Sequence, residues 1–105
     1  MLVSIILVIK NEAIHIQKCI ESLLKQSYKD FEIIILDDQS TDETLDLINS
    51  FKSNKIKIFS TKRTQLKGHA NRRNYALSKA KGEFLFFTDG DCVTHYNWIK
   101  EGLEV

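Results

Sequence analysis

Apolar and polar residues alternate along this chain in segments of two kinds. Residues 2–9 (LVSIILVI) and 31–36 (FEIIIL) are short, continuous apolar and β-branched runs, which predict parallel strands covered on both faces. Residues 55–60 (KIKIFS) alternate between polar and apolar side chains, which predicts a strand nearer a sheet edge. Residues 83–88 (EFLFFT) predict a fourth strand, which we expect to be buried.

The segments between these strands have the spacing of amphipathic helices. Asn11 is placed to cap a helix whose apolar residues recur at helical intervals: Ile16, Cys19, Ile20, Leu23 and Leu24. Residues 40–43 (STDE) form a capping-box pattern, which predicts the start of a second helix. Residues 69–82 predict a third helix that stops at its terminal glycine, and residues 95–105 begin a fourth.

Strand and helix therefore alternate, which predicts an α/β fold. We expect an open, mostly parallel sheet with helices on both faces, connected by right-handed crossovers. At 105 residues, the chain predicts a single domain, residues 1–105. Because it stops inside the last predicted helix, we expect a truncated part of a longer protein.

Composition narrows the class of protein. With 43% hydrophobic and 28% charged residues, the chain fits a globular protein, and no apolar run approaches the roughly 20 residues that cross a bilayer. Its 2 cysteines form no CxxC pair, so we expect a reducing compartment and a cytoplasmic protein.

The net charge of +1 hides an uneven distribution. Residues 30–46 contain acids and no Lys or Arg, whereas residues 47–82 contain Lys and Arg and no acid. This asymmetry indicates an anionic partner for the basic segment and a cation for the acidic one. A net charge near zero argues against nucleic acid as that partner.

Polar residues follow three of the predicted strands at the carboxyl end, where open parallel sheets bind ligands. They are Lys10, Asn11 and Glu12 after the first strand, Asp37 and Asp38 after the second, and Asp89, Gly90 and Asp91 after the fourth. Acids placed for solubility would be scattered over helix surfaces, so this grouping predicts a binding site at one rim of the sheet.

The Asp89-Gly90-Asp91 tripeptide suits a hard divalent cation, which takes oxygen ligands and can itself hold the phosphates of a substrate. Gly90 allows a sharp turn that directs a carboxylate to the rim. The alternative is an ordinary turn between a strand and a helix, since Asp and Gly are common turn residues.

Two further groups of residues could contact the same ligand. Asp37 and Asp38 could accept hydrogen bonds from a base or sugar, or could simply favour the dipole of the next helix. Arg73, near the start of a predicted helix, could hold a phosphate. Neighbouring helix residues point about 100° apart, so we expect either Arg72 or Arg73 to point inward and the other to be solvated.

Several motifs occur together in a recognisable order. They are the Asn-Glu of "VSIILVIKNEA", the segment "DFEIIILDDQSTDET", the Arg-Asn before "AKGE", and the D-x-D of "FTDGD". From Val3 to about Trp98, the chain closely resembles the N-terminal half of inverting family 2 glycosyltransferases with the GT-A fold.

The resemblance implies a metal-dependent enzyme that transfers a sugar from a nucleotide-diphosphate donor, a UDP-sugar foremost, to an acceptor hydroxyl. It implies that Asp91 binds Mg²⁺ or Mn²⁺, with Asp89 beside it on the ribose or sugar side, and that Asp38 hydrogen-bonds the base. The full set of implied donor-binding residues is Val8, Lys10, Glu12, Asp37, Asp38, Arg73, Asp89, Gly90 and Asp91.

The chain departs from the family pattern at two positions. Lys10 stands where an aromatic residue is frequent, and Arg72 stands where a small residue is commoner. The general base and the acceptor-binding residues of the family lie beyond Val105, so we expect this chain to bind the donor only.

The resemblance also implies partners and a place of action. These are a glycan or lipid-linked acceptor, a role in polysaccharide biosynthesis, and action at the inner face of the membrane by the full-length protein. A homodimer is a separate expectation, because an exposed sheet edge or apolar face could pair two copies. An alternative is a non-catalytic nucleotide-binding or assembly module with the same fold. A third interpretation, a receiver-like α/β domain, would lack the basic segment that ends in Arg-Asn.

Overall fold

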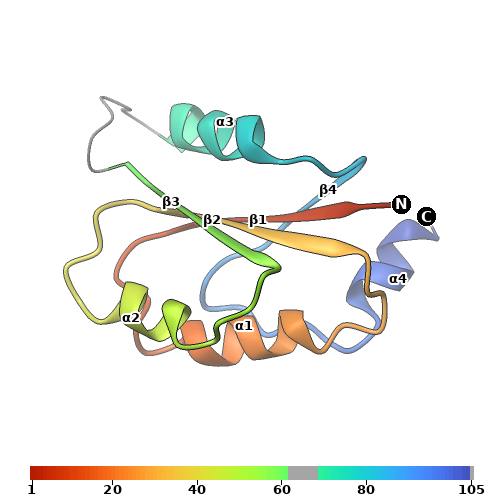
Figure 1. Cartoon of the computed structure of the whole chain (residues 1–105), viewed down its shortest axis with the longest axis horizontal. Coiled ribbons are helices and arrows are strands. Elements are labelled where there is room, and N and C mark those ends of the chain that lie inside the picture. The colour runs from red at the N-terminus through yellow and green to blue at the C-terminus, as the bar shows by residue number, and fades with distance from the viewer. Residues whose placement is uncertain (62–68, 105) are drawn as a thin grey trace.

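The computed structural model describes residues 1–61 and 69–104. Strands and helices alternate along the chain (Figure 1): β1 (Val3–Ile9), α1 (Ile16–Leu24), β2 (Phe31–Asp37), α2 (Thr44–Asn49), β3 (Ile56–Ser60), α3 (His69–Lys79), β4 (Phe84–Phe87) and α4 (Trp98–Leu103). The strands pair in parallel in the order β3-β2-β1-β4. The predicted open parallel sheet is therefore confirmed.

Helices cover both faces of this sheet, as predicted. Figure 1 shows α3 on one face and α1, α2 and α4 on the other. Alternate residues of β1 serve the two layers: Ile5 and Leu7 pack toward the α1 face, whereas Ile6 packs with Ala76 of α3. No helix among the described residues is both long enough and apolar enough to cross a membrane.

The prediction of a buried fourth strand is wrong. In the part of the chain that the structure describes, β4 pairs with β1 alone and forms a sheet edge. Phe84, Leu85 and Phe87 are 46%, 45% and 40% exposed. Phe86 is half-buried and packs edge-on against Trp98, with ring centroids 5.2 Å apart. An apolar run shows that a strand can be buried, but its position in the sheet decides whether it is.

Both predicted N-terminal helix caps are also wrong. Asn11 adopts a left-handed backbone (φ 52), and α1 begins only at Ile16. Ser40 does not cap α2, because its Oγ donates a hydrogen bond to Asp37. Glu43 occupies the N-cap position without a side-chain cap, and Oδ1 of Asp42 accepts the backbone N–H of Thr44 at 3.0 Å.

Gly82 does not end α3, which stops at Lys79. A Cβ at Gly82 would stand 2.6 Å from both the backbone nitrogen and Oγ of Ser4, so this position requires glycine for a close approach. The N–H of Gly82 donates to Ser4 Oγ (2.8 Å), which in turn donates to the carboxylate of Glu32 (2.6 Å). The segment between α3 and β4 is thereby fastened to β1 and β2.

Glu32 is a charged residue inside the sheet, only 3% exposed. Its carboxylate accepts hydrogen bonds from Nζ of Lys57 (2.8 Å), Oγ of Ser4 (2.6 Å) and the backbone N–H of Lys81 (2.7 Å). Burial opposes ionisation of this group, but the three donors outweigh it and lower its pKa below the usual 4.5.

Candidate functional site

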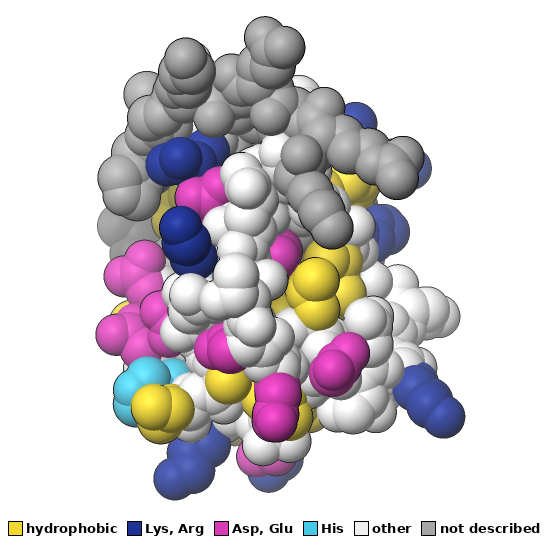
Figure 2. Space-filling model, turned by 90° about the vertical axis from the view of Figure 1, so that its left-hand side faces the viewer, with side chains coloured by type: hydrophobic (Ala, Val, Ile, Leu, Met, Phe, Trp, Pro, Cys, Tyr) yellow, Lys and Arg dark blue, Asp and Glu magenta, His cyan; other side chains and the backbone are white. Residues whose placement is uncertain are grey.

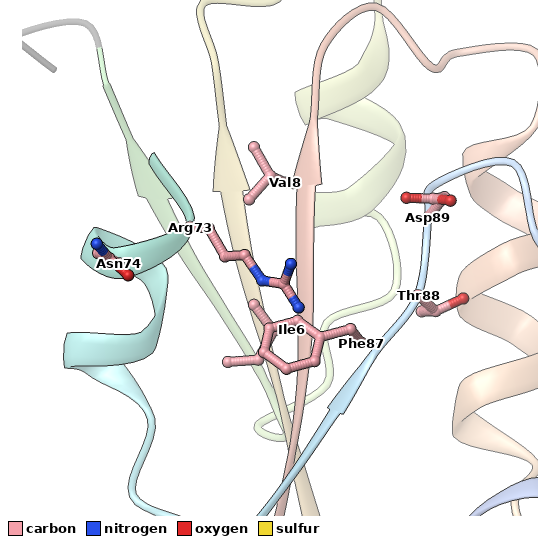
Figure 3. A pocket seen from close by; sticks show the side chains of 7 residues that line it. All are labelled: Ile6, Val8, Arg73, Asn74, Phe87, Thr88 and Asp89. Atoms are coloured by element: carbon pink, nitrogen blue, oxygen red, sulfur yellow. The ribbon is translucent and has the colours of Figure 1, made fainter. Parts of the chain in front are cut away.

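The strand order places a crevice where β1 separates β2 from β4. The chain leaves β1 toward β2 on one side and returns to it as β4 on the other, which is the point where open α/β sheets bind ligands. A cavity of about 590 Å³ lies at this point (Figure 3), lined by Ile6, Val8, Arg73, Asn74, Phe87, Thr88 and Asp89. Figure 2, which faces the carboxyl ends of the strands, shows acidic side chains gathered over this end.

Arg73 extends from α3 across the cavity toward β4. Its guanidinium carbon lies 4.0 Å from the centroid of the Phe87 ring. Figure 3 shows the guanidinium group next to that ring. This cation–π contact holds a partly solvated cation in a fixed place at the cavity wall. Arg73 therefore places a cation at the cavity wall, and its role in holding a phosphate stays a prediction.

Arg72 points in a different direction, toward the end of β2. Its Nε lies 3.1 Å from Oδ2 of Asp38, and the two side chains are 26% and 14% exposed. Oδ1 of Asp38 accepts a hydrogen bond from Oγ1 of Thr61 at 2.8 Å. The two arginines do diverge as helix geometry predicts: Arg72 is half-buried against an acid, and Arg73 is exposed along the cavity.

Asp37 and Asp38 have different surroundings. Asp37 is 1% exposed, and its carboxylate accepts hydrogen bonds from the N–H and Oγ of Ser40. It shapes the loop that follows β2. Asp38, at the same rim, keeps a partly accessible carboxylate on the α3 side of the sheet.

The loops after β1 and β2 are joined through Asn11. Its Oδ1 accepts the N–H of Thr41 (2.7 Å), and its own N–H donates to Ser40 Oγ (2.9 Å). The N–H of Glu12 donates to Oγ1 of Thr44 at 2.9 Å. These contacts fix Glu12 beside the site, whereas Lys10, just before them, is exposed.

The Asp89–Asp91 turn brings together groups that could hold a cation. One ligand atom each of Asp89, Asp91 and Cys92 lies within 4.8 Å of the others, and all three side chains are exposed. The two carboxylates fit a hard divalent cation that also keeps water or phosphate ligands, whereas the sulfur of Cys92 suits softer metals. Cys92 was not predicted to join this cluster.

Gly90 serves the site in a way that the sequence did not indicate. Its φ lies outside the left-handed range, so the turn itself does not require glycine. A Cβ there would come within 3.0 Å of Ile9 and 3.1 Å of Glu12. Glycine thus lets the turn after β4 lie directly against the segment after β1.

Among the predicted donor-binding residues, the structure places three in the cavity wall: Val8, Arg73 and Asp89. Gly90 and Asp91 directly follow Asp89, and Glu12, after β1, lies beside Gly90. Sequence reasoning missed the lining residues Ile6, Asn74, Phe87 and Thr88. The alternation of β4 carried a usable signal for Phe87, which lies two positions before Asp89 and therefore faces the same side of the sheet.

Comparison with known proteins identifies the family. Residues 4–105 match Glycosyl transferase family 2. The chain is 47% identical over 90 residues to UDP-Glc:alpha-D-GlcNAc-diphosphoundecaprenol beta-1,3-glucosyltransferase WfaP of Escherichia coli, an alignment covering 86% of this chain and 35% of WfaP.

Solved structures agree with the sequence match. S. aureus TarS in complex with UDP-GlcNAc superposes with a TM-score of 0.86 at 32% identity, over 99% of this chain and 30% of that one. The mannosyltransferase PcManGT from Pyrobaculum calidifontis, in complex with GDP-Man and Mn²⁺, superposes with a TM-score of 0.74 at 27% identity, over 85% and 27%.

The chain spans about a third of the length of the relatives that it matches. Its parallel sheet has the GT-A arrangement of those structures, and its match to the family profile extends from Ser4 to the last residue. The chain therefore belongs to glycosyl transferase family 2, of which it represents an N-terminal portion.

Proposed function

We propose that the protein containing this chain transfers a sugar from a nucleotide-diphosphate donor, a UDP-sugar, to an acceptor hydroxyl, and that residues 1–105 form the donor-binding part of one domain. The observation that carries this proposal is the cavity wall, where Arg73 stands on the α3 side and Asp89 on the β4 side. A cationic and an anionic wall together suit a diphosphate that carries a divalent cation.

The relatives support the donor class. WfaP is named for UDP-Glc, and the TarS and PcManGT complexes contain UDP-GlcNAc and GDP-Man. In this chain, Asp38 accepts a hydrogen bond from the base, Val8 and Glu12 border the nucleoside, and Arg73 binds a phosphate oxygen. The loop contacts of Asp37 and Asn11 keep Asp38 and Glu12 in place.

Asp91 and Asp89 hold the cation in this proposal, Mg²⁺ or Mn²⁺. The close grouping of their carboxylates, and the Mn²⁺ in the PcManGT complex, support it. A bound cation would neutralise charge on the departing diphosphate. Without a cation, the carboxylates of Asp89 and Asp91 repel each other and the diphosphate.

Transfer itself requires a base that removes the proton of the acceptor hydroxyl as its oxygen bonds to the anomeric carbon and the diphosphate leaves. We place this base, and the acceptor site, in the part of the protein that follows residue 105. The name of WfaP, which includes a diphosphoundecaprenol, supports a lipid-linked acceptor. Action in the cytoplasm at the membrane surface remains a prediction. A homodimer remains a prediction.

Calorimetry of this chain with UDP, with and without Mn²⁺, tests the proposal. We expect binding that strengthens at least tenfold with Mn²⁺ and that loses this gain in Asp91→Asn. Asp46→Asn, which removes an exposed acid on α2, is the matched control and should behave as wild type. UDP affinity that changes neither with Mn²⁺ nor in Asp91→Asn would contradict the metal assignment. The absence of any UDP binding would contradict the donor site.

A turnover assay distinguishes the proposed transferase from the non-catalytic nucleotide-binding alternative. The longer protein should hydrolyse or transfer a UDP-sugar when given an acceptor, whereas a nucleotide-binding module would bind UDP without releasing sugar. The chain of residues 1–105 alone should bind UDP and show no transfer.

A further inference from the structure

We propose that Arg72 is a specificity residue: with Asp38 it forms a donor–acceptor pair that selects a base in which a ring N–H lies beside a carbonyl. This proposal rests on the proposed function, because it concerns the base of the same donor nucleotide.

The carboxylate of Asp38 is held from two sides. Nε of Arg72 lies 3.1 Å from Oδ2, and Oγ1 of Thr61 donates to Oδ1 at 2.8 Å. The backbone N–H of Asp38 donates to the carbonyl of Ile9, which fixes the main chain at the same point. A carboxylate restrained in this way presents its remaining lone pairs in fixed directions, since each carboxylate offers about four acceptor positions.

Arg72 has donors left after it reaches Asp38. Its Nε lies 3.1 Å from Oδ2 of Asp38, yet this buried nitrogen forms no hydrogen bond within residues 1–61 and 69–104. Besides Nε, the guanidinium carries about four N–H donors on its two Nη atoms, and it lies beside the Asp38 acceptor on the α3 side of the sheet. The pair is only partly exposed, so a ligand that enters will meet donors and an acceptor already in place.

This arrangement discriminates between bases by hydrogen-bond polarity. Uracil and guanine present a ring N–H next to a carbonyl, which matches an acceptor next to a donor. Cytosine and adenine present a ring nitrogen acceptor next to an amino group, which is the reverse. A reversed edge would place lone pairs against the Asp38 carboxylate and leave buried groups unpaired, and sites of this kind reject such ligands strongly.

Arg73 provides the contrast, because it lies on the same helix but faces the cavity and Phe87. Its contact with a phosphate would be the same for every base. The two adjacent arginines thus divide the donor between them: Arg72 recognises the base and Arg73 the diphosphate.

The experiment measures UDP and CDP affinities by calorimetry in Mn²⁺, since these ligands differ only at the base edge. Wild type should bind UDP at least 10-fold more tightly than CDP. Arg72→Met, which keeps the stem but removes the donors, should lower UDP affinity by about 10-fold and bring the UDP/CDP ratio close to 1. Arg73→Met should weaken both ligands equally. Asp38→Asn, which adds an amide donor, should shift the ratio toward CDP.

If Arg72 had only a structural role, its substitution would change the melting temperature and the two affinities in a different way. Loss of the ion pair would lower the melting temperature and weaken UDP and CDP by the same factor, and an unchanged UDP/CDP ratio in Arg72→Met would overturn the inference. If wild type binds neither ligand, the proposed function fails and this inference fails with it. If wild type binds UDP but Arg72→Met keeps its selectivity, only the inference fails.

Discussion

The thiol of Cys19, in the middle of α1, donates a hydrogen bond to the backbone carbonyl of Asp89, 3.4 Å away. The same carbonyl accepts the N–H of Cys92 at 3.1 Å. One carbonyl thus joins the buried layer of α1 to the turn that carries Asp89 and Asp91. The position of the candidate cation site depends on a side chain that lies in the hydrophobic core.

The two cysteines should differ sharply in reactivity. Cys19 is fully buried and Cys92 is exposed. In native protein, a thiol reagent should modify one cysteine, which mass spectrometry should place at Cys92; both should react in urea. Rapid native labelling of Cys19 would show that α1 opens far more readily than its packing implies.

Stability should fall at alkaline pH because of Cys19. Burial, helped by nearby Cys92 and acidic groups, raises the pKa of this thiol from 9.0 to about 12. Above pH 9 the unfolded chain releases a proton that the folded chain keeps, so the free energy of unfolding drops by about 1.4 kcal/mol per pH unit until the folded thiol also ionises. Urea titrations from pH 8 to 11 should show this slope in wild type and a shallower one in Cys19→Ala.

Two substitutions at Asn11 should separate the loss of its side-chain acceptor from the strain of its left-handed backbone. Asn11→Gly tolerates φ 52 but loses the acceptor for Thr41, and should cost about 1 kcal/mol of stability. Asn11→Ala loses the acceptor and also strains the backbone, and should cost about 1 kcal/mol more. Urea unfolding measures both. Equal stabilities of the two variants would mean that the left-handed backbone at this position carries no strain.

Glu32 should protect the fold at neutral pH and lose this effect in acid. Its pKa is lowered in the folded state, so its contribution is present above about pH 4.5 and disappears as pH falls through the folded pKa. Glu32→Gln should cost about 1–3 kcal/mol at pH 7 and progressively less below pH 4.5. Glu83→Gln, at an exposed position, is the control. A cost of Glu32→Gln that is constant from pH 7 to 3 would contradict the assignment.

Phe87 should affect phosphate binding through Arg73. Phe87→Leu keeps an apolar side chain but removes the ring beneath the guanidinium, a contact worth about 0.5–1 kcal/mol, so UDP affinity should fall by about 2–5-fold. Uridine, which has no phosphate, should bind both proteins equally. Phe84→Leu makes the same change at an exposed position outside the cavity, and an equal loss of UDP affinity there would show a general effect on β4.

Long apolar runs and strand-end acids could be read from the sequence because their signals are local. Continuous runs predicted β1 and β2, and the acids after them predicted one rim. The sequence could not show that β4 lies at an edge of the sheet formed by the described residues, since strand order depends on pairing between residues as distant as Val3 and Phe84.

The helix caps failed for a related reason. Asn11 and Ser40 have the side chains of caps, but each makes its hydrogen bonds with the opposite loop or with Asp37. Arg72 shows the same limit: its spacing predicted a direction, and only the folded chain identified Asp38 as its partner.

The pairing of β4 with β1 has a consequence for how the protein folds. A single helical connection joins β1 to β2, so these two strands pair across a short stretch of chain. Pairing of β1 with β4 joins Val3 to Phe84, which lies much farther along the chain. Closing the longer loop between β1 and β4 costs more chain entropy. In the folded chain, β4 is also short and mostly exposed. We therefore expect the β2 side of the crevice to form early and the β4 side last. In native hydrogen exchange, amides of β4 should open well before those of β2, and a ligand spanning both sides should slow that opening.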